Sequence, residues 1–280
     1  MDLLTVETFA RPTDDDALRA LQPTLGADRT LLGGGTWLFS VPQPHLAGVV
    51  DLAGLGWEPL VAAGDGLTVA ATTTLAALGD VDPSSYPAWP AVASFRGCAE
   101  ALVGSRKVRQ VATVGGNVCL ALPAAPMITL AAVLDATATI WLPDGRSRTA
   151  PVVDLVAGPQ RNALAPGEVL RSLHLPAVAL RARTALRKAS LSPLGRSAAL
   201  LAGRRGEDGF VLAVTASLPR PAVLRYDDVP TAGALAADVA AAGETVGGGW
   251  YDDPHGSPAW RRAMSLLFAE EIRRELGGTG

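Results

Sequence analysis

The sequence predicts an α+β fold divided into two or three subdomains, and three observations support this prediction. The chain has 280 residues, of which 49% are hydrophobic and only 18% charged, which is enough to bury a sizeable core. Segments typical of strands and of helices are interleaved through residues 1–176. Near the end, three apolar segments are separated by turn residues, a pattern typical of antiparallel strands.

The first fifty residues are predicted to form a strand, a helix, a strand, a loop and a strand. Residues 4–9 alternate in polarity, Asp14, Asp15 and Asp16 place negative charge at a helix start, and residues 29–32 lead into a run of glycines. Pro42 and Pro44 then exclude a long helix after that run.

The rest of the chain is predicted to continue as mixed strands and helices. Asp144-Gly145 lies between two apolar segments and is a strong signal for a two-residue hairpin. The predicted strands are 67–71, 136–142, 146–150, 170–175, 186–191, 198–202 and 210–218, and the predicted helices are 73–78, 91–103, 234–242 and 258–276.

Composition excludes several function classes. The net charge is −3 and no segment interleaves basic with aromatic residues, so no nucleic-acid partner is predicted. Cys98 and Cys119 are the only cysteines, too few to ligate an iron–sulfur cluster or a four-cysteine zinc site. The three histidines, His45, His174 and His255, form no recognisable triad or metal motif.

No membrane span is predicted either. The longest apolar stretch, residues 118–134, is interrupted by Pro123 and Pro126, which favours a buried loop followed by a core helix. The first residues lack a basic segment followed by an apolar run, so no secretory signal is predicted and a cytoplasmic location is expected.

Two glycine loops, about eighty residues apart, are the most informative motifs. They are Gly33-Gly34-Gly35-Thr36-Trp37-Leu38 and Thr113-Val114-Gly115-Gly116-Asn117. Consecutive glycines let backbone N–H groups approach an anion, so the pair predicts a clamp for a diphosphate. A Rossmann turn is disfavoured because Leu38 stands at its third glycine position. A P-loop is disfavoured because neither Lys107 nor Lys188 stands in its motif.

The order of these segments resembles the FAD-binding subunits of molybdenum hydroxylases, the group that contains the flavin subunits of xanthine dehydrogenase and carbon monoxide dehydrogenase. The resemblance covers nearly the whole chain. It is carried by Phe9-Ala10-Arg11-Pro12, Leu32-Gly33-Gly34-Gly35-Thr36, Val50-Asp51-Leu52, Ala70-Ala71-Thr72-Thr73, Val108-Arg109-Gln110-Val111-Ala112-Thr113-Val114-Gly115-Gly116-Asn117 and His255-Gly256-Ser257-Pro258-Ala259-Trp260-Arg261-Arg262.

The resemblance implies a PCMH-type FAD-binding fold of two α+β subdomains, residues 1–55 and 56–176, and a C-terminal α+β domain, 177–280, with a three-stranded antiparallel sheet. It also implies that the backbone of Gly34 to Leu38, Gly115 and Gly116 holds the FAD diphosphate. The cofactor-binding residues expected on this basis are Gly33, Gly34, Gly35, Thr36, Trp37, Leu38, Thr113, Gly115, Gly116, Asn117, Arg161, Leu170 and Lys188.

Some of these residues have a second interpretation. Leu170 is equally typical of a core, and Arg161 and Lys188 of a surface, although a positive charge near the flavin would raise its potential. Two positions depart from the family. Pro126 stands where many members carry an acidic residue, nine positions after Asn117, and Trp37 stands where a small or polar residue is usual. An indole at that place can stack on the cofactor or pack in the core.

The function implied by the resemblance is electron transfer. Electrons from a molybdenum site on a large partner subunit would pass through [2Fe-2S] clusters on a small partner subunit to FAD on this chain, and then to NAD or another acceptor. A dimer of heterotrimers is expected on the same basis. Two alternatives stay open: a stand-alone FAD oxidoreductase of this fold, and a scaffold subunit that has lost flavin.

Overall fold

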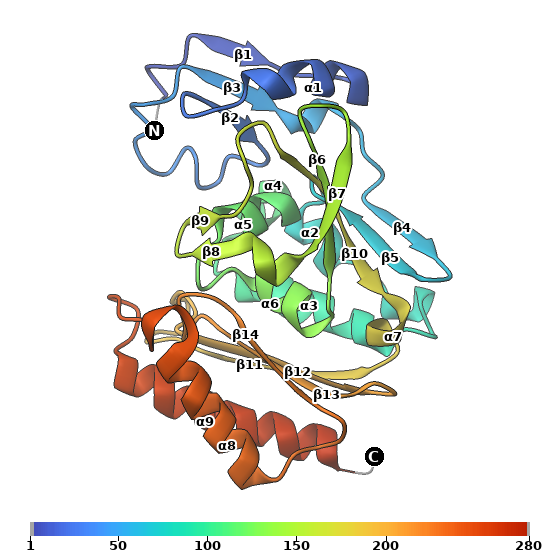
Figure 1. Cartoon of the computed structure of the whole chain (residues 1–280), viewed down its shortest axis with the longest axis vertical. Helices are drawn as coiled ribbons and strands as arrows, with labels where there is room; N and C mark the ends of the chain where they lie inside the picture. The colour runs from blue at the N-terminus through green and yellow to red at the C-terminus, as the bar shows by residue number, and fades with distance from the viewer. Residues whose placement is uncertain (1–2, 279–280) are drawn as a thin grey trace.

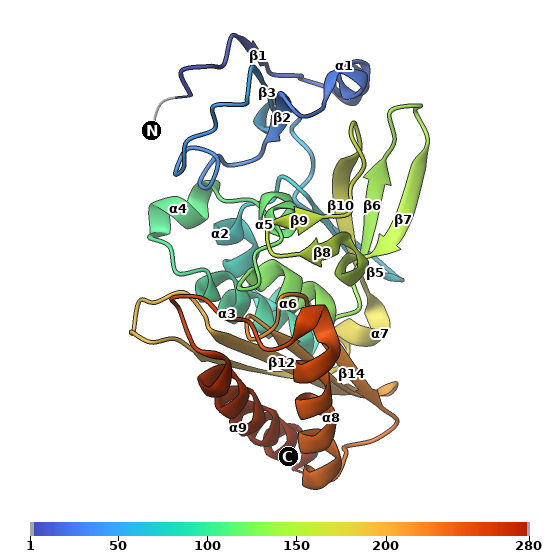
Figure 2. The same ribbon diagram turned by 60° about the vertical axis from the view of Figure 1, so that its left-hand side comes forward.

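The computed structural model describes residues 3–278. Within them, three larger β-sheets follow one another along the chain, together with one short two-stranded pair. In Figures 1 and 2 the first sheet lies at the top, the second in the middle and the third at the bottom. Their strands come from residues 8–51, 60–176 and 183–226.

The first sheet is parallel, with the order β1-β3-β2. It contains β1 (Thr8–Ala10), β2 (Arg29–Leu32) and β3 (Gly48–Asp51), and α1 (Asp15–Leu21) lies between the first two strands in sequence. The carboxylate of Asp14 accepts a hydrogen bond from the Ala17 N–H, so the predicted helix start is confirmed. The strand predicted at 4–9 begins only at Thr8, because pairing with β3 begins there.

The second sheet is antiparallel, with the order β4-β5-β10-β6-β7. The predicted hairpin between β6 and β7 forms, but its turn has three residues and not two, because the Leu142 N–H donates to the Arg146 carbonyl and residues 143–145 lie between them, with Gly145 at a φ of +84°. The strands are β4 (Leu60–Ala63), β5 (Gly66–Ala70), β6 (Thr137–Trp141), β7 (Ser147–Pro151) and β10 (Val169–Pro176). The short pair consists of β8 (Val156–Gly158) and β9 (Arg161–Asn162).

Five helices gather beside this sheet (Figure 1). They are α2 (Leu75–Gly79), α3 (Ser94–Ala101), α4 (Arg106–Val111), α5 (Val114–Leu120) and α6 (Pro126–Val133). The helix predicted at 91–103 is shorter than expected. Pro90 opens a 3-10 turn (Pro90–Ala93), and α3 ends where Leu102 turns to an extended conformation.

The third sheet corrects one prediction, because it has four strands and not three. They form an antiparallel meander of β11 (Arg183–Ala189), β12 (Ala199–Gly206), β13 (Gly209–Thr215) and β14 (Ala222–Tyr226). The fourth strand is short and follows Pro219 and Pro221, which read as a loop in the sequence. The short helix α7 (Ala177–Leu180) leads into this sheet.

Helices cover both faces of the third sheet. α8 (Ala232–Thr245) and α9 (Pro258–Gly277) pack on the lower face in Figure 1, and α3 and α6 pack on the upper face. Every residue of β13 and of α6 is buried for this reason, which explains why each contains only one polar residue, Thr215 and Thr129, whose hydroxyls bond to each other. In residues 3–278 we find no helix that is both long enough and apolar enough to cross a membrane.

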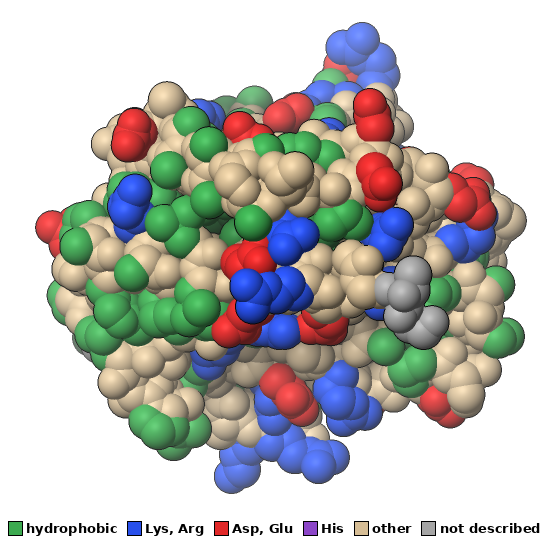
Figure 3. Space-filling view, turned by 90° about the horizontal axis from the view of Figure 1, so that it is seen from below, with side chains coloured by type: hydrophobic (Ala, Val, Ile, Leu, Met, Phe, Trp, Pro, Cys, Tyr) green, Lys and Arg blue, Asp and Glu red, His purple; other side chains and the backbone are tan. Residues whose placement is uncertain are grey.

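The outer face of the layer formed by α8 and α9 carries intermixed charges. Figure 3 shows this face from below, with basic and acidic side chains side by side at its centre. Arg187 pairs with Glu271 and Glu275 across β11 and α9, and Glu270 pairs with Arg273 and Arg274 along α9. These charges of α9 and β11 are therefore paired with each other.

Candidate functional site

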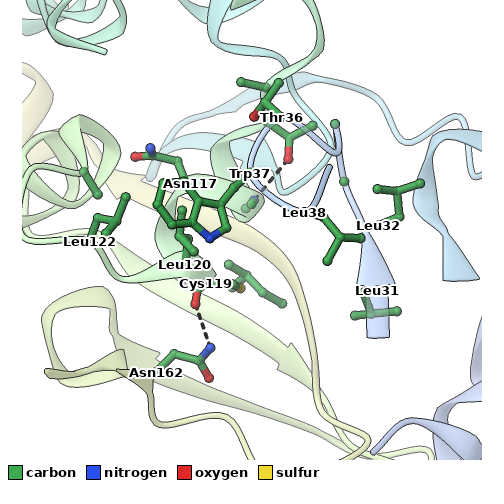
Figure 4. Close-up of a pocket in the computed structure, with 18 of the residues that line it drawn as sticks. Leu31, Leu32, Thr36, Trp37, Leu38, Asn117, Cys119, Leu120, Leu122 and Asn162 are labelled. Atoms are coloured by element: carbon green, nitrogen blue, oxygen red, sulfur yellow. Dashed lines mark hydrogen bonds between the residues drawn. The ribbon is translucent and has the colours of Figure 1, made fainter. Parts of the chain in front are cut away.

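A cavity of about 970 Å³ lies where the three sheets and the central helices meet. Its walls come from the loop after β2, from α5 and the loop that follows it, from residues 162–170 and from the third domain. Both predicted glycine loops line it (Figure 4). Segments distant in sequence therefore converge on one site.

The first glycine loop presents unused hydrogen-bond donors to this cavity. Gly35 has a φ of +68°, and its carbonyl oxygen accepts a hydrogen bond from the Phe39 N–H, which turns the chain back on itself. Within the described residues, the five successive N–H groups of residues 34–38 donate to no acceptor. Adjacent backbone donors of this kind form a binding site for an anion.

The first glycine loop packs directly against Thr113 of the second loop and against Val111, which precedes it. A Cβ atom at Gly34 would lie 1.6 Å from the carbonyl oxygen of Val111, and one at Gly33 would lie 2.6 Å from Thr113 Oγ1. Only glycine fits at this contact, because side chains would force the loops apart.

The second glycine pair differs from the expectation in one respect, because its N–H groups already have acceptors within the chain. The Gly115 N–H donates to the Ala71 carbonyl at 2.8 Å, and the Gly116 N–H donates to Thr113 Oγ1 at 3.0 Å. A Cβ atom at Gly115 would lie 2.5 Å from Ala71 Cβ, so this glycine permits close packing. The Thr113 hydroxyl still has its hydrogen to donate to a ligand.

Asn117 joins the cavity to the start of α6. Its Oδ1 accepts a hydrogen bond from the Met127 N–H at 3.0 Å, which leaves the Nδ2 hydrogens free to donate to a ligand. Pro126 is buried in the first turn of α6 and does not line the cavity. The position at which this chain has Pro126 in place of the family's acidic residue therefore lies outside the cavity wall.

Asn162 is a lining residue that the sequence did not predict. Its Nδ2 donates to the Cys119 carbonyl at 2.7 Å, drawn as a dashed line in Figure 4, and its Oδ1 accepts from the Leu164 N–H. These bonds hold the 162–168 segment against α5. The neighbouring Arg161, which was predicted, does not line the cavity.

Of the remaining predicted residues, all except Lys188 line the cavity. Leu170 lines the cavity from β10 and is only 3% exposed. Lys188 lies on β11, where burial lowers the pKa of its amine, and its side chain does not line the cavity. Gly33 to Leu38, Thr113, Gly115, Gly116 and Asn117 all line it.

The third domain contributes residues that sequence reasoning missed. Leu194, Arg196 and Ser197 come from the loop between β11 and β12, and His255 comes from the turn before α9. The guanidinium of Arg196 lies 5.9 Å from the centroid of the Trp37 ring. No motif marks Leu194, Arg196 or Ser197, and the motif that begins at His255 gave no sign that this histidine reaches the cavity.

The carboxylate and the thiol in the cavity wall are not reactive groups, because the carboxylate is ion-paired and the thiol is protonated. The carboxylate of Glu168 is bound by Arg148 at 2.7 Å, and this pairing lowers the pKa of Glu168. Burial raises the pKa of the Cys119 thiol to about 12, so the thiol is neutral at pH 7. Among residues 3–278, no group of three or more His, Cys, Asp or Glu side chains is placed to hold a metal ion.

This arrangement suits an elongated ligand with an anionic centre. The five N–H groups of residues 34–38, with the Thr113 hydroxyl and the Asn117 amide, can donate to phosphate oxygens. Apolar side chains on either side can cover planar groups. The wall includes Leu31, Leu32, Leu52, Leu102, Leu120, Leu122 and Leu170. The residues present therefore fit a dinucleotide.

Residues 5–178 match the family described as the FAD-binding domain in molybdopterin dehydrogenase. A comparison with curated proteins gives no match. Several solved structures have similar folds. A chain of reconstituted CO dehydrogenase from Oligotropha carboxidovorans aligns with a TM-score of 0.84 at 22% identity, covering 99% of both chains.

Two further structures align over nearly their whole length. A chain of quinoline 2-oxidoreductase from Pseudomonas putida 86 has a TM-score of 0.79 at 20% identity, covering 99% of this chain and 98% of that one. A chain of carbon monoxide dehydrogenase from Hydrogenophaga pseudoflava has a TM-score of 0.80 at 20% identity, covering 97% of both. At these identities the likeness establishes the fold.

Proposed function

This chain belongs to the family of FAD-binding domains in molybdopterin dehydrogenases, and from that premise we propose that it is the FAD-binding, electron-transferring subunit of a molybdenum hydroxylase built from unlike chains. The family match covers residues 5–178 and confirms the family expected from the sequence. The subunit role, the path of the electrons and the acceptor are parts of the proposal.

The observation that carries this proposal is the row of unused donors at residues 34–38. These N–H groups line the cavity, and the contact of Gly34 with the Val111 carbonyl keeps them in place. A diphosphate supplies anionic oxygens to such donors without any specific side chain. Backbone capture also explains how Trp37 can replace a small residue in the loop.

Each wall residue has a role in this proposal. The N–H groups of residues 34–38 hold the diphosphate, and Thr113 and Asn117 donate to it from the opposite loop. Leu170 and the other leucines cover planar parts of the cofactor. When bound, FAD supplies the redox chemistry, and the chain supplies position and electrostatics. Gly115 serves by letting α5 pack closely on Ala71, and Gly116 by its close approach to Thr113 Oγ1.

The proposed division of labour follows from the cysteine count. Two cysteines are too few for an iron–sulfur cluster, so the [2Fe-2S] clusters are assigned to a small partner subunit and the molybdenum cofactor to a large one. NAD is the first acceptor to test. The cytoplasmic location, the dimer of heterotrimers and the domain boundaries at residues 55 and 176 belong to the same proposal.

Affinity purification of the tagged chain from the organism that encodes it tests this proposal. We expect two unlike chains to co-purify, with FAD, iron and molybdenum bound to the complex and with electron transfer to NAD as one assay. Recovery of the chain alone, with FAD and with activity of its own, would instead favour a stand-alone FAD oxidoreductase. Recovery with partners but without flavin would favour a scaffold.

A further inference from the structure

Trp37 and Arg196 make a contact between the first and third domains inside the cavity. Trp37 belongs to the first glycine loop and Arg196 to the loop between β11 and β12, and the guanidinium lies 5.9 Å from the indole centroid. Both residues line the cavity. Figure 4 shows the indole projecting from its loop toward the side of the cavity formed by Asn117 and Leu120.

Arg196 is the cation that lies over this indole. Among the described residues it forms no ion pair, and its guanidinium lies 5.9 Å from the ring centroid. A cation placed over an indole is attracted by the negative face of the ring, which holds the ring plane in one orientation. Because the indole also lines the cavity, we infer that its opposite face meets a planar group bound there.

The place of this contact indicates which planar group that is. The loop that carries Arg196 also lines the cavity with Leu194, which is 85% exposed, so this part of the wall is open to solvent. A redox ring that exchanges electrons with another protein has to lie where that protein can approach. The exposed end of the cavity is therefore the place for the flavin ring, and the Trp37 indole lies at that end.

We infer that Trp37 stacks on the isoalloxazine ring of FAD and that Arg196 is a positioning residue that fixes the indole for this stacking. The inference rests on the proposed function and adds a role for two residues of different domains. It explains why a bulky aromatic residue is compatible with the glycine loop. Stacked aromatic pairs gain affinity beyond the area that they bury.

Flavin emission is the most direct test, because an indole stacked on an excited isoalloxazine quenches it. FAD titrations of the purified chain and of Trp37→Phe, Trp37→Ala and Arg196→Gln would give both the emission of bound flavin and the dissociation constant. Trp89→Phe and Arg220→Gln are matched controls, since both residues lie outside the cavity. Circular dichroism checks that each variant is folded.

We expect flavin bound to the unmodified chain to be strongly quenched and flavin bound to Trp37→Phe to be several-fold brighter. Trp37→Ala should weaken FAD binding about tenfold. Arg196→Gln should brighten the bound flavin and weaken binding about two- to fivefold, with Arg196→Lys restoring most of the quenching. The controls should behave as the unmodified chain.

Two other outcomes have different consequences. If the unmodified chain binds FAD but the emission of bound flavin is the same in Trp37→Phe, the stacking is overturned while the proposed function stands. If the unmodified chain binds no FAD, the proposed function fails and the inference fails with it.

Discussion

Gly34 lies against Val111 so closely that a Cβ atom would stand 1.6 Å from the Val111 carbonyl oxygen. The contact joins the loop after β2 to the end of α4, so it sets the distance between the two glycine loops. We predict that Gly34→Ala abolishes FAD binding, because the added methyl must push the loop with its free N–H groups out of place. Equilibrium titration with FAD measures this.

The matched control is Gly64→Ala. Gly64 has open space around it, so the added methyl should leave FAD affinity and thermal stability unchanged. An unchanged FAD affinity in Gly34→Ala would show that the loop contact does not organise the site.

Asn117 should have two separable roles. Asn117→Asp keeps an oxygen acceptor for the Met127 N–H, so its melting temperature should stay close to that of the unmodified chain. It replaces the Nδ2 donor with negative charge beside the proposed diphosphate, and FAD binding should weaken at least about tenfold. Asn117→Ala should lose both, with a stability cost of about 1 kcal/mol. If Asn117→Asp and the unmodified chain bind FAD with equal affinity, the Asn117 side chain does not contact the diphosphate.

Arg204 is predicted to be the most important single side chain for the packing of the third sheet. Its guanidinium is fully buried, and it binds Asp208, Asp135 and the Val133 carbonyl. Arg204→Met leaves the partly buried carboxylate of Asp208 without its hydrogen-bond partner, while Asp135 keeps Arg225, and it should lower the free energy of unfolding by about 3 kcal/mol. Arg205→Met, on the partly exposed next position, should cost less than about 1 kcal/mol. Similar urea midpoints for the two variants would contradict this.

The cysteines should make stability fall at high pH. Burial raises the pKa of the Cys98 and Cys119 thiols from 9.0 to about 12. The unfolded chain therefore releases these protons first, and their contribution is lost between pH 9 and 12, by about 1.4 kcal/mol per thiol for each pH unit. Urea unfolding at pH 8 and pH 10 should show a smaller decrease in a variant with both cysteines replaced by alanine. An identical decrease would place its cause elsewhere.

Much of the fold could be predicted from the sequence because the relevant signals are local. Asp14 caps α1 as expected, and Asp144-Gly145 lies in the turn of the predicted hairpin, although that turn has one residue more than predicted. The strand Ala222–Tyr226 was missed because two prolines precede it. Its extended conformation depends on antiparallel pairing with β13, which its own sequence does not signal.

In the candidate site, too, residues with a local sequence signal were predicted, and residues placed by tertiary packing were not. Both glycine loops were predicted, since glycine at a close backbone contact has a local signature. Arg196, Ser197 and His255 were not, because only the packing of the third sheet beneath α6 brings them to the cavity. Arg161 was predicted at the cavity, yet it is the next residue, Asn162, that lines it. Alternation along β9 separates the two side chains.

The absorption spectrum of the purified chain, followed by release and identification of any bound flavin, tests the central claim most directly. We predict an oxidised-flavin spectrum and FAD released in a near one-to-one ratio to the chain, either as purified or after reconstitution with FAD. A colourless protein that reconstitution with FAD does not change would contradict the claim that residues 34–38 hold a diphosphate.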